Sequence, residues 1–217
     1  MAQMKTPGVY IIEKNAFPNS VVEVATAIPA FIGHTQFARD GNKDLTGIPF
    51  RISSMAEFHS FFGFAPTLRF GIRPEDSESE DTTNDINVLF PDGSCQLTLP
   101  KTFYALYYNM LLFYANGGGP CYIVSVGDYE HDFKSIDFTN ALLALKKEQE
   151  PTLVVVPEAV YMEEGDCYKV QTAALMHCGN DMKNRFAILD VFNGYKDENG
   201  AVIKSFRENI GSNFLAY

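Results

Sequence analysis

The stretch NGGGPCYIVSV, residues 116–126, decides the fold, because it joins a helix-like segment to a strand-like one. In a phosphate-binding loop the order is the reverse: a strand precedes the glycines, and the helix that follows turns its N-terminal N–H groups toward the anion. Here the aromatic segment 103–114 comes first and the apolar run 121–126 comes second. This order predicts that Gly117, Gly118 and Gly119 form a structural turn that ends a helix and reverses the chain into a buried strand.

The chain after residue 100 continues to alternate between helical and strand-like segments. Apolar side chains in residues 103–114 recur at the i, i+3 and i+4 spacing of a buried helix face. The runs 153–156 and 186–189 are apolar without a break, which is typical of parallel strands covered on both faces. The alternation predicts an α/β fold, a mostly parallel sheet covered by helices on both faces. We expect strands near residues 28–33, 121–126, 152–156 and 185–191, and helices near 101–115, 137–149 and 165–178.

Capping residues predict several helix ends. Ser54 and Glu57 form a capping box that starts a short helix, and Gly63 stops it. Asp137 or Thr139 can cap the helix 137–149. Gly179 is expected to end the helix 165–178.

Three parts are expected along the chain. Residues 1–19 form an N-terminal extended arm, residues 20–65 and 100–217 the α/β core, and residues 66–99 a small inserted β-hairpin with an acidic loop. The turn sequence PDGS at 91–94, between two short apolar pieces, predicts the hairpin. The arm is apolar on both faces over residues 9–12, so it must be paired and covered. Residues 21–24 predict a further strand.

Composition and charge exclude several classes of protein. The chain has 217 residues, of which 46% are hydrophobic, so it can form one or two folded domains. Its net charge is −10, but six acids lie in residues 75–85, which we expect to be a solvated loop. The remainder is nearly balanced, which argues against a nucleic-acid partner. The sequence contains neither a secretory signal nor a membrane span, and this predicts a soluble protein made in the cytoplasm that does not bind membranes.

One group of residues gives an enzymatic alternative. Asp128, Glu158 and Asp190 follow three predicted parallel strands, at the edge where α/β sheets bind ligands and where carboxylates often hold magnesium. A magnesium-dependent hydrolase and a small-ligand binding module at this edge are therefore the two alternatives. The simpler interpretation is that these acids are solvated at strand ends. For Asp190, which is followed by Val191 and Phe192, a paired position inside the fold is the alternative.

The histidines and cysteines have no spacing that is typical of a metal, redox or nucleophile site. We therefore expect no enzyme activity, no cofactor and no metal, with reduced core cysteines and with histidines that are exposed or hydrogen-bonded. The residues are His34, His59, His131 and His177, and Cys95, Cys121, Cys167 and Cys178.

Six segments resemble, in the same order, segments of contractile tail sheath proteins, the family of phage tail sheaths and of the sheaths of extracellular contractile injection systems. The resemblance spans residues 6–190 and is closest to the injection-system sheaths. The segments are TPGVYIIE (6–13), AIPAFIG (27–33), EFHSFFG (57–63), NGGGPCYIVSV (116–126), PTLVVVP (151–157) and RFAILD (185–190).

The resemblance implies a structural subunit that assembles helically around an inner tube and contracts to drive the tube through a target envelope. Its partners would be neighbouring sheath subunits, the inner tube protein, and baseplate and terminator proteins. After synthesis in the cytoplasm it would become part of a phage tail or an injection-system particle. Family members continue beyond a segment like 214–217 into a further C-terminal domain, so the chain resembles the N-terminal portion of a sheath.

The resemblance also implies that neighbouring subunits exchange arms. An exchanged strand binds through main-chain hydrogen bonds, and its alternating side chains set the register. An ordinary first strand that pairs within its own domain is the alternative. The residues expected in inter-subunit strand exchange are Val9, Tyr10, Ile11, Ile12 and Glu13.

Overall fold

The computed structural model describes residues 27–68, 70–74, 85–90, 93–98, 102–196 and 200–211. Its core is a five-stranded sheet of order β10-β9-β1-β8-β4. β1 pairs in parallel with β8 and β9, β10 pairs in parallel with β9, and β4 is an antiparallel edge strand on β8. The predicted α/β fold with a mostly parallel sheet is confirmed. The strands are β1 (Pro29–Gly33), β4 (Phe50–Ile52), β8 (Cys121–Ser125), β9 (Leu153–Val155) and β10 (Phe186–Ile188).

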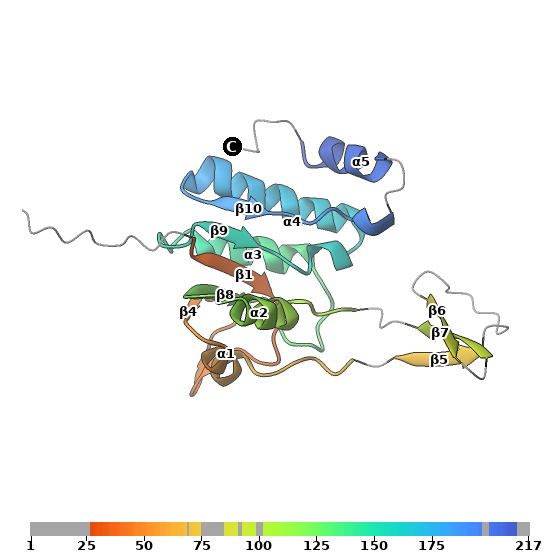
Figure 1. The fold of residues 1–217 in the computed structure, drawn as a ribbon. Coiled ribbons are helices and arrows are strands. Elements are labelled where there is room, and N and C mark those ends of the chain that lie inside the picture. The colour runs from red at the N-terminus through yellow and green to blue at the C-terminus, as the bar shows by residue number, and fades with distance from the viewer. Residues whose placement is uncertain are drawn as a thin grey trace, which may run out of the picture.

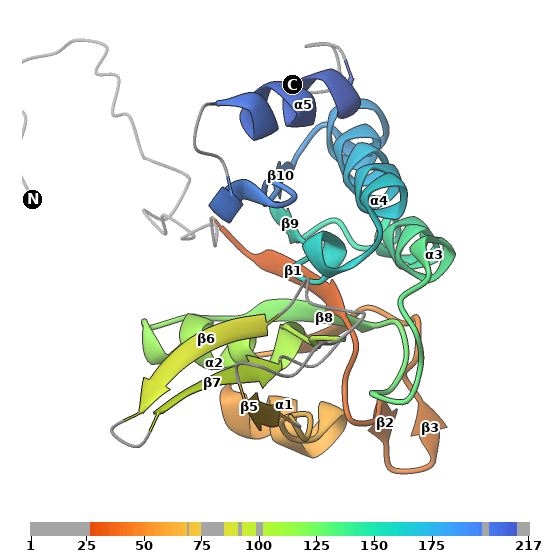
Figure 2. The same cartoon turned by 90° about the vertical axis from the view of Figure 1, so that its right-hand side faces the viewer.

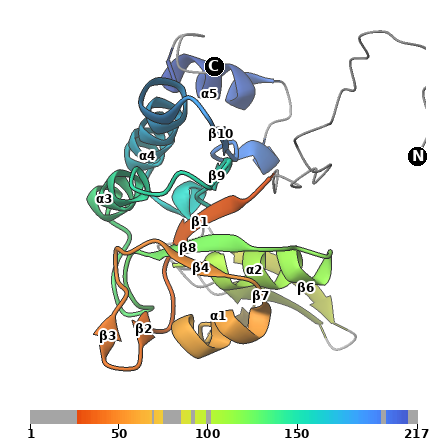
Figure 3. The same ribbon diagram turned by 90° about the vertical axis from the view of Figure 1, so that its left-hand side faces the viewer.

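Helices lie on both faces of this sheet (Figures 2 and 3). Side chains of a strand point alternately to its two faces. In β1, Ala30 and Ile32 therefore join the apolar cluster under α3 and α4, whereas Phe31 joins the cluster under α1 and α2. The helices are α1 (Met55–Phe62), α2 (Leu106–Ala115), α3 (Ser135–Leu145) and α4 (Glu164–Met176).

The glycine turn connects α2 to β8. The N–H of Gly118 bonds to the carbonyl of Phe113 at 2.9 Å, and the N–H of Gly117 bonds to the carbonyl of Tyr114 at 3.1 Å. Gly117 has a φ of +82°, the left-handed conformation that favours glycine. These two bonds and this conformation define a Schellman motif, which ends the helix and satisfies its last carbonyls.

The insertion holds more than the expected hairpin. β6 and β7 pair in antiparallel fashion as predicted, but a third strand, β5, pairs on the other side of β7. Figure 1 shows this small sheet standing apart from the core sheet. Most of the acidic run lies outside the described residues. The strands are β5 (Gly71–Pro74), β6 (Asp85–Phe90) and β7 (Gly93–Thr98).

Two helices begin at other residues than predicted. α2 begins at Leu106 rather than near residue 101, because its first turn bonds to a carboxylate from elsewhere in the chain (see below). α3 begins at Ser135, so the expected caps are wrong: Asp137 lies in the first turn, and the Thr139 hydroxyl donates to the carbonyl of Ile136.

The end of α4 also differs from the prediction. Gly179 does not stop the helix, because the chain continues as a π-helix over His177–Met182. This turn ends at Lys183, whose φ of +58° is left-handed and whose N–H bonds to the carbonyl of Cys178. The remaining elements, none of them predicted, are β2 (Arg39–Asp40), β3 (Lys43–Asp44), two 3₁₀ turns (Ala159–Tyr161 and Gly194–Lys196) and α5 (Ala201–Asn209).

Candidate functional site

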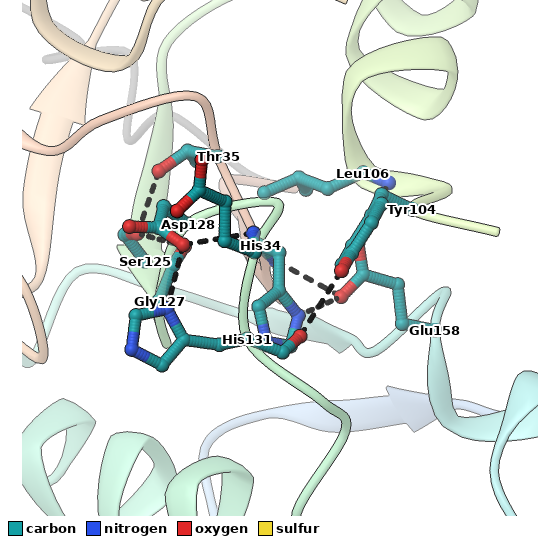
Figure 4. A network of polar contacts seen from close by, with 10 residues as sticks. His34, Thr35, Tyr104, Leu106, Ser125, Gly127, Asp128, His131 and Glu158 are labelled. Atoms are coloured by element: carbon teal, nitrogen blue, oxygen red, sulfur yellow. Dashed lines mark hydrogen bonds and ion pairs between the residues drawn. The ribbon is translucent and has the colours of Figure 1, made fainter. Parts of the chain in front are cut away.

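The carboxyl ends of β1, β8 and β9 meet at one edge of the sheet because these strands are parallel neighbours. His34 and Thr35 follow β1 directly, Asp128 follows β8, and Glu158 follows β9. Their polar side chains form the network drawn in Figure 4. This edge is where open α/β sheets usually bind ligands, so it is the natural candidate site.

Glu158 lies at the centre of the network and is fully buried. Its Oε2 accepts hydrogen bonds from the main-chain N–H of His34 at 2.9 Å and from the His34 ring at Nδ1, 2.8 Å away. Its Oε1 accepts from the N–H of Leu106 at 3.2 Å, at the N-terminus of α2. No side chain of α2 itself caps this end. Glu158 therefore acts as the cap of α2, where a carboxylate also interacts favourably with the helix dipole.

Aromatic rings enclose the His34 side chain, which is 1% exposed. The ring centroids of Phe133, Tyr104 and Phe138 lie 4.9, 5.3 and 5.7 Å from that of His34. Burial, and then the charge of Glu158, raise the pKa of Tyr104. The His34–Glu158 pair is thus held inside the fold, away from water.

Gly33 allows the Glu158 carboxyl group to approach the sheet. A Cβ atom at Gly33 would lie 3.1 Å from both Cδ and Oε1 of Glu158, and 2.9 Å from Cβ of Leu106. These separations are shorter than ordinary van der Waals contact. The last residue of β1 must therefore be small for the carboxylate to reach α2.

The three carboxylates of the proposed magnesium site are not brought together. Asp128 is on the surface, where its Oδ1 contacts Nδ1 of His131 at 2.6 Å and accepts a hydrogen bond from the N–H of Glu130 at 2.9 Å. The bond to His131 is the main cause that lowers the pKa of Asp128. Asp190 is exposed and is not the paired internal acid that its sequence suggested. Its main-chain carbonyl, rather than its side chain, accepts a bond from Gln171. Within the described ranges, no three His, Cys, Asp or Glu side chains gather as a metal site.

The hydroxyl groups at this edge bond to each other. Oγ of Ser125 and Oγ1 of Thr35 are 2.6 Å apart, and both hydroxyls also lie within bonding distance of main-chain carbonyls. Because the ring of His34 points to Glu158, it does not activate either hydroxyl as a nucleophile. A polar cleft of about 500 Å³ opens beside these residues and is lined in part by Asp128, His131 and Lys134.

The cysteines are not poised for chemistry. Burial raises the pKa of Cys121 and of Cys178 to about 11, and that of Cys167 to about 12. A thiolate is the reactive form, so these buried thiols are inert near neutral pH. The expected reduced core cysteines are confirmed at these three positions, whereas Cys95 is only half-buried.

No local motif predicts the pairing of His34 with Glu158. An indirect signal was present: both residues follow neighbouring parallel strands, and a histidine and a glutamate at the same sheet edge can pair. The position of Tyr104 above this pair depends on the extended chain before α2, which was predicted as helix. The arm residues Val9, Tyr10, Ile11, Ile12 and Glu13 lie outside the described residues.

None of the helices in the described part of the chain is long and apolar enough to cross a membrane. No protein-family model matches the chain, and no curated protein matches it significantly. Function must therefore be argued from the residues and the fold.

Proposed function

We propose that this chain is a structural subunit of a contractile sheath. Such a subunit assembles helically around an inner tube and contracts to drive the tube through a target envelope. Its partners are neighbouring sheath subunits, the inner tube protein, and the baseplate and terminator proteins. The assembled particle is a phage tail or an injection system.

The observation that carries this proposal is where the sheath-like segments fall in the fold. Five of the six segments lie on β1, on α1 and its terminal Gly63, on the junction of α2 with β8, on β9 and on β10. Four of these positions are in the central sheet, and they follow the order in which the resemblance was found. The expected helix-to-strand junction and the expected core strands have the predicted type of structure, and this agreement supports the resemblance.

The candidate site also supports a structural role. The buried polar groups Glu158 and His34 bond to each other, and Glu158 also bonds to the first turn of α2, so this part of the edge fixes one helix against the sheet. Buried polar groups that are fully hydrogen-bonded stiffen and specify a fold. A sheath subunit that moves as a rigid body between two packings needs such a core.

Exposed apolar side chains support a role in assembly. Phe186 on β10 is 71% exposed, and Tyr195 is 81% exposed. Exposed apolar patches commonly mark surfaces that contact another protein. Among the described residues β10 pairs with β9 alone, so it is an edge strand of the sheet.

Electron microscopy of the chain co-expressed with the inner tube protein tests the proposal. We expect helical sheaths around tubes, or stacked rings, since subunits joined head to tail form open helical filaments. A monodisperse monomer with metal-dependent turnover contradicts the proposal. Magnesium-dependent hydrolysis that disappears in each of the variants Asp128→Ala, Glu158→Ala and Asp190→Ala would favour the enzymatic alternative instead.

A further inference from the structure

A groove of about 680 Å³ runs along the face of the sheet on the side of α2. Phe31 of β1, Val155 of β9 and Ile188 of β10 line its floor. Leu112 and Phe113 of α2, followed by the glycine turn, line its wall. Asn109 and Asn116 of the same wall add polar groups, but most of the lining is apolar side chains and glycine backbone.

The groove exists because the helices cover the two faces of the sheet unequally. On one face α3 and α4 pack against β1, β8, β9 and β10. On the other face α1 and α2 cover the β8 side, and the end toward β10 is left bare (Figures 2 and 3). As a result Leu112 is 66% exposed and Ile188 is 51% exposed among the described residues. Covering apolar surface of this kind with a further segment removes it from water and so stabilises the fold.

The chain enters the described fold at the end of this groove. Ala27, the first described residue, lines the groove and has a φ of +69°. Left-handed backbone at a residue other than glycine costs about 1–2 kcal/mol and persists where surrounding contacts hold it. Ala27 therefore marks the place, beside the groove, at which the N-terminal segment joins the described fold.

Residues 21–24 are close enough in the chain to fill the groove. They precede Ala27 by three to six residues, so an extended chain places them within roughly 10–20 Å of it. A segment tethered this closely has an effective concentration on the order of millimolar, which favours it over a segment from another molecule.

The sequence of this segment also fits a surface with one apolar side. In an extended strand, Val22 and Val24 lie on one face, and Val21 and Glu23 lie on the other. Val22 and Val24 can therefore face the groove while Glu23 stays in water. Residues 9–12 are apolar on both faces and lie farther from Ala27, so they fit this site less well.

We infer that Val22 and Val24 of the same chain pack into the groove between α2 and the bare end of the sheet. The segment covers Leu112 and Ile188 and completes the core on this face. The inference holds whether or not the chain assembles into a sheath.

A tryptophan placed in the groove tests this packing, because the chain contains no tryptophan of its own. The Leu112→Trp variant of the whole chain should show blue-shifted emission and weak quenching by acrylamide. The matched Leu143→Trp variant, at a 56% exposed position on α3, should show red-shifted emission and strong quenching. Equal quenching of the two variants overturns the inference.

A second substitution in the Leu112→Trp chain identifies the segment. Val22→Asp should expose the indole and lower the midpoint of thermal unfolding by about 4 °C or more. Val21→Asp, on the opposite face of the strand, should change neither. If instead Ile11→Asp or Leu215→Asp exposes the indole and Val22→Asp does not, another segment fills the groove and the inference is wrong.

A dilution series separates the same chain from a second copy. Shielding of the indole should be independent of protein concentration from about 0.1 to 100 μM. Shielding that is lost on dilution would show that a second molecule supplies the segment, and would overturn the inference.

Discussion

Arg185 donates a hydrogen bond to His177 inside the fold: Nη1 of the arginine lies 3.1 Å from Nε2 of the histidine. Both residues are buried, at 4% and 2% exposure. The guanidinium group also bonds to the carbonyls of Leu145 and Glu148 at the C-terminal end of α3. A cation at the C-terminal end of a helix is favoured by the helix dipole, which helps to compensate the burial of Arg185. Because Nε2 of His177 accepts this hydrogen bond, the proton of the neutral ring is on Nδ1. This Nδ1 atom has no hydrogen-bond partner among the described residues.

This arrangement predicts that acid destabilises the protein through His177. Burial, and then the charge of Arg185, lower the pKa of His177 from 6.5 to about 4. The unfolded chain therefore takes up this proton at a higher pH than the folded chain. The free energy of unfolding should be unaffected above pH 6.5 and should fall as the pH drops from 6.5 toward 4, by up to about 3 kcal/mol.

Urea denaturation at a series of pH values measures this loss. The His177→Gln variant keeps an acceptor for Arg185 but has no titrating ring, so its stability should change less over the same range. An identical pH dependence in the variant and the parent chain would mean that other groups cause the acid sensitivity.

Glu158→Gln should destabilise the fold even though it preserves the size of the side chain. The carboxylate accepts three N–H groups, and an amide nitrogen in place of either oxygen would face a donor instead. We expect a loss of about 1–3 kcal/mol in the free energy of unfolding, measured in urea. The matched change Asp128→Asn, at a carboxylate on the surface, should cost about 0.5 kcal/mol or less. Equal effects of the two changes would contradict the capping role of Glu158.

The three glycines of the α2–β8 turn should respond differently to alanine. At Gly117 the cost should be about 1 kcal/mol, because its φ of +82° is strained for alanine. At Gly118 we expect a larger loss, since a Cβ would lie 2.5 Å from the Phe113 ring and 2.7 Å from its carbonyl oxygen. Gly119→Ala should be nearly neutral, because a Cβ there meets no atom within 4 Å. Thermal unfolding of the three variants would give this order, and a large effect at Gly119 would not fit the geometry.

If neighbouring subunits exchange N-terminal strands, as the sheath proposal implies, substitutions in the strand should affect assembly but not the stability of the subunit. Val9→Asp combined with Ile11→Asp should abolish sheath formation in electron micrographs of the co-expressed proteins. The thermal midpoint of the chain should stay within about 2 °C, because these residues would pair with a neighbour rather than with their own core. Gln3→Asp serves as the control and should assemble normally. A large loss of thermal stability in the double variant would show that the segment pairs within its own domain.

The sequence predicted the central sheet well, because its parallel strands coincide with uninterrupted runs of apolar residues. Residues 121–126, 152–156 and 185–191 were each recognised on this basis, and β8, β9 and β10 lie within them. The short edge strand β4 was missed, because three residues give no pattern that distinguishes them from a loop. α5 was missed for a different reason: its segment of the sequence contains several charged residues and no long apolar stripe.

The errors at helix ends have a common physical cause. The start of α2 depends on Glu158, which is 52 residues away in the chain, so no local capping signal exists at Leu106. α4 continues through Gly179 because a π-turn places His177 and Cys178 against the core. In both cases tertiary contacts override local preference, and a sequence pattern reports local preference only.

The central position of β1 also has a consequence for how the protein is made. Phe31 pairs with Ile123 on one side and with Val155 on the other, so the first strand of the sheet must wait for partners that are synthesised much later. At about 5–20 residues per second, a ribosome needs roughly 6–25 s to add the residues between Phe31 and Val155. During that time β1 is an apolar segment without its sheet neighbours. Such long-range pairing slows folding and exposes apolar surface to aggregation, and we therefore expect recovery of this protein to depend on temperature and on chaperones during expression.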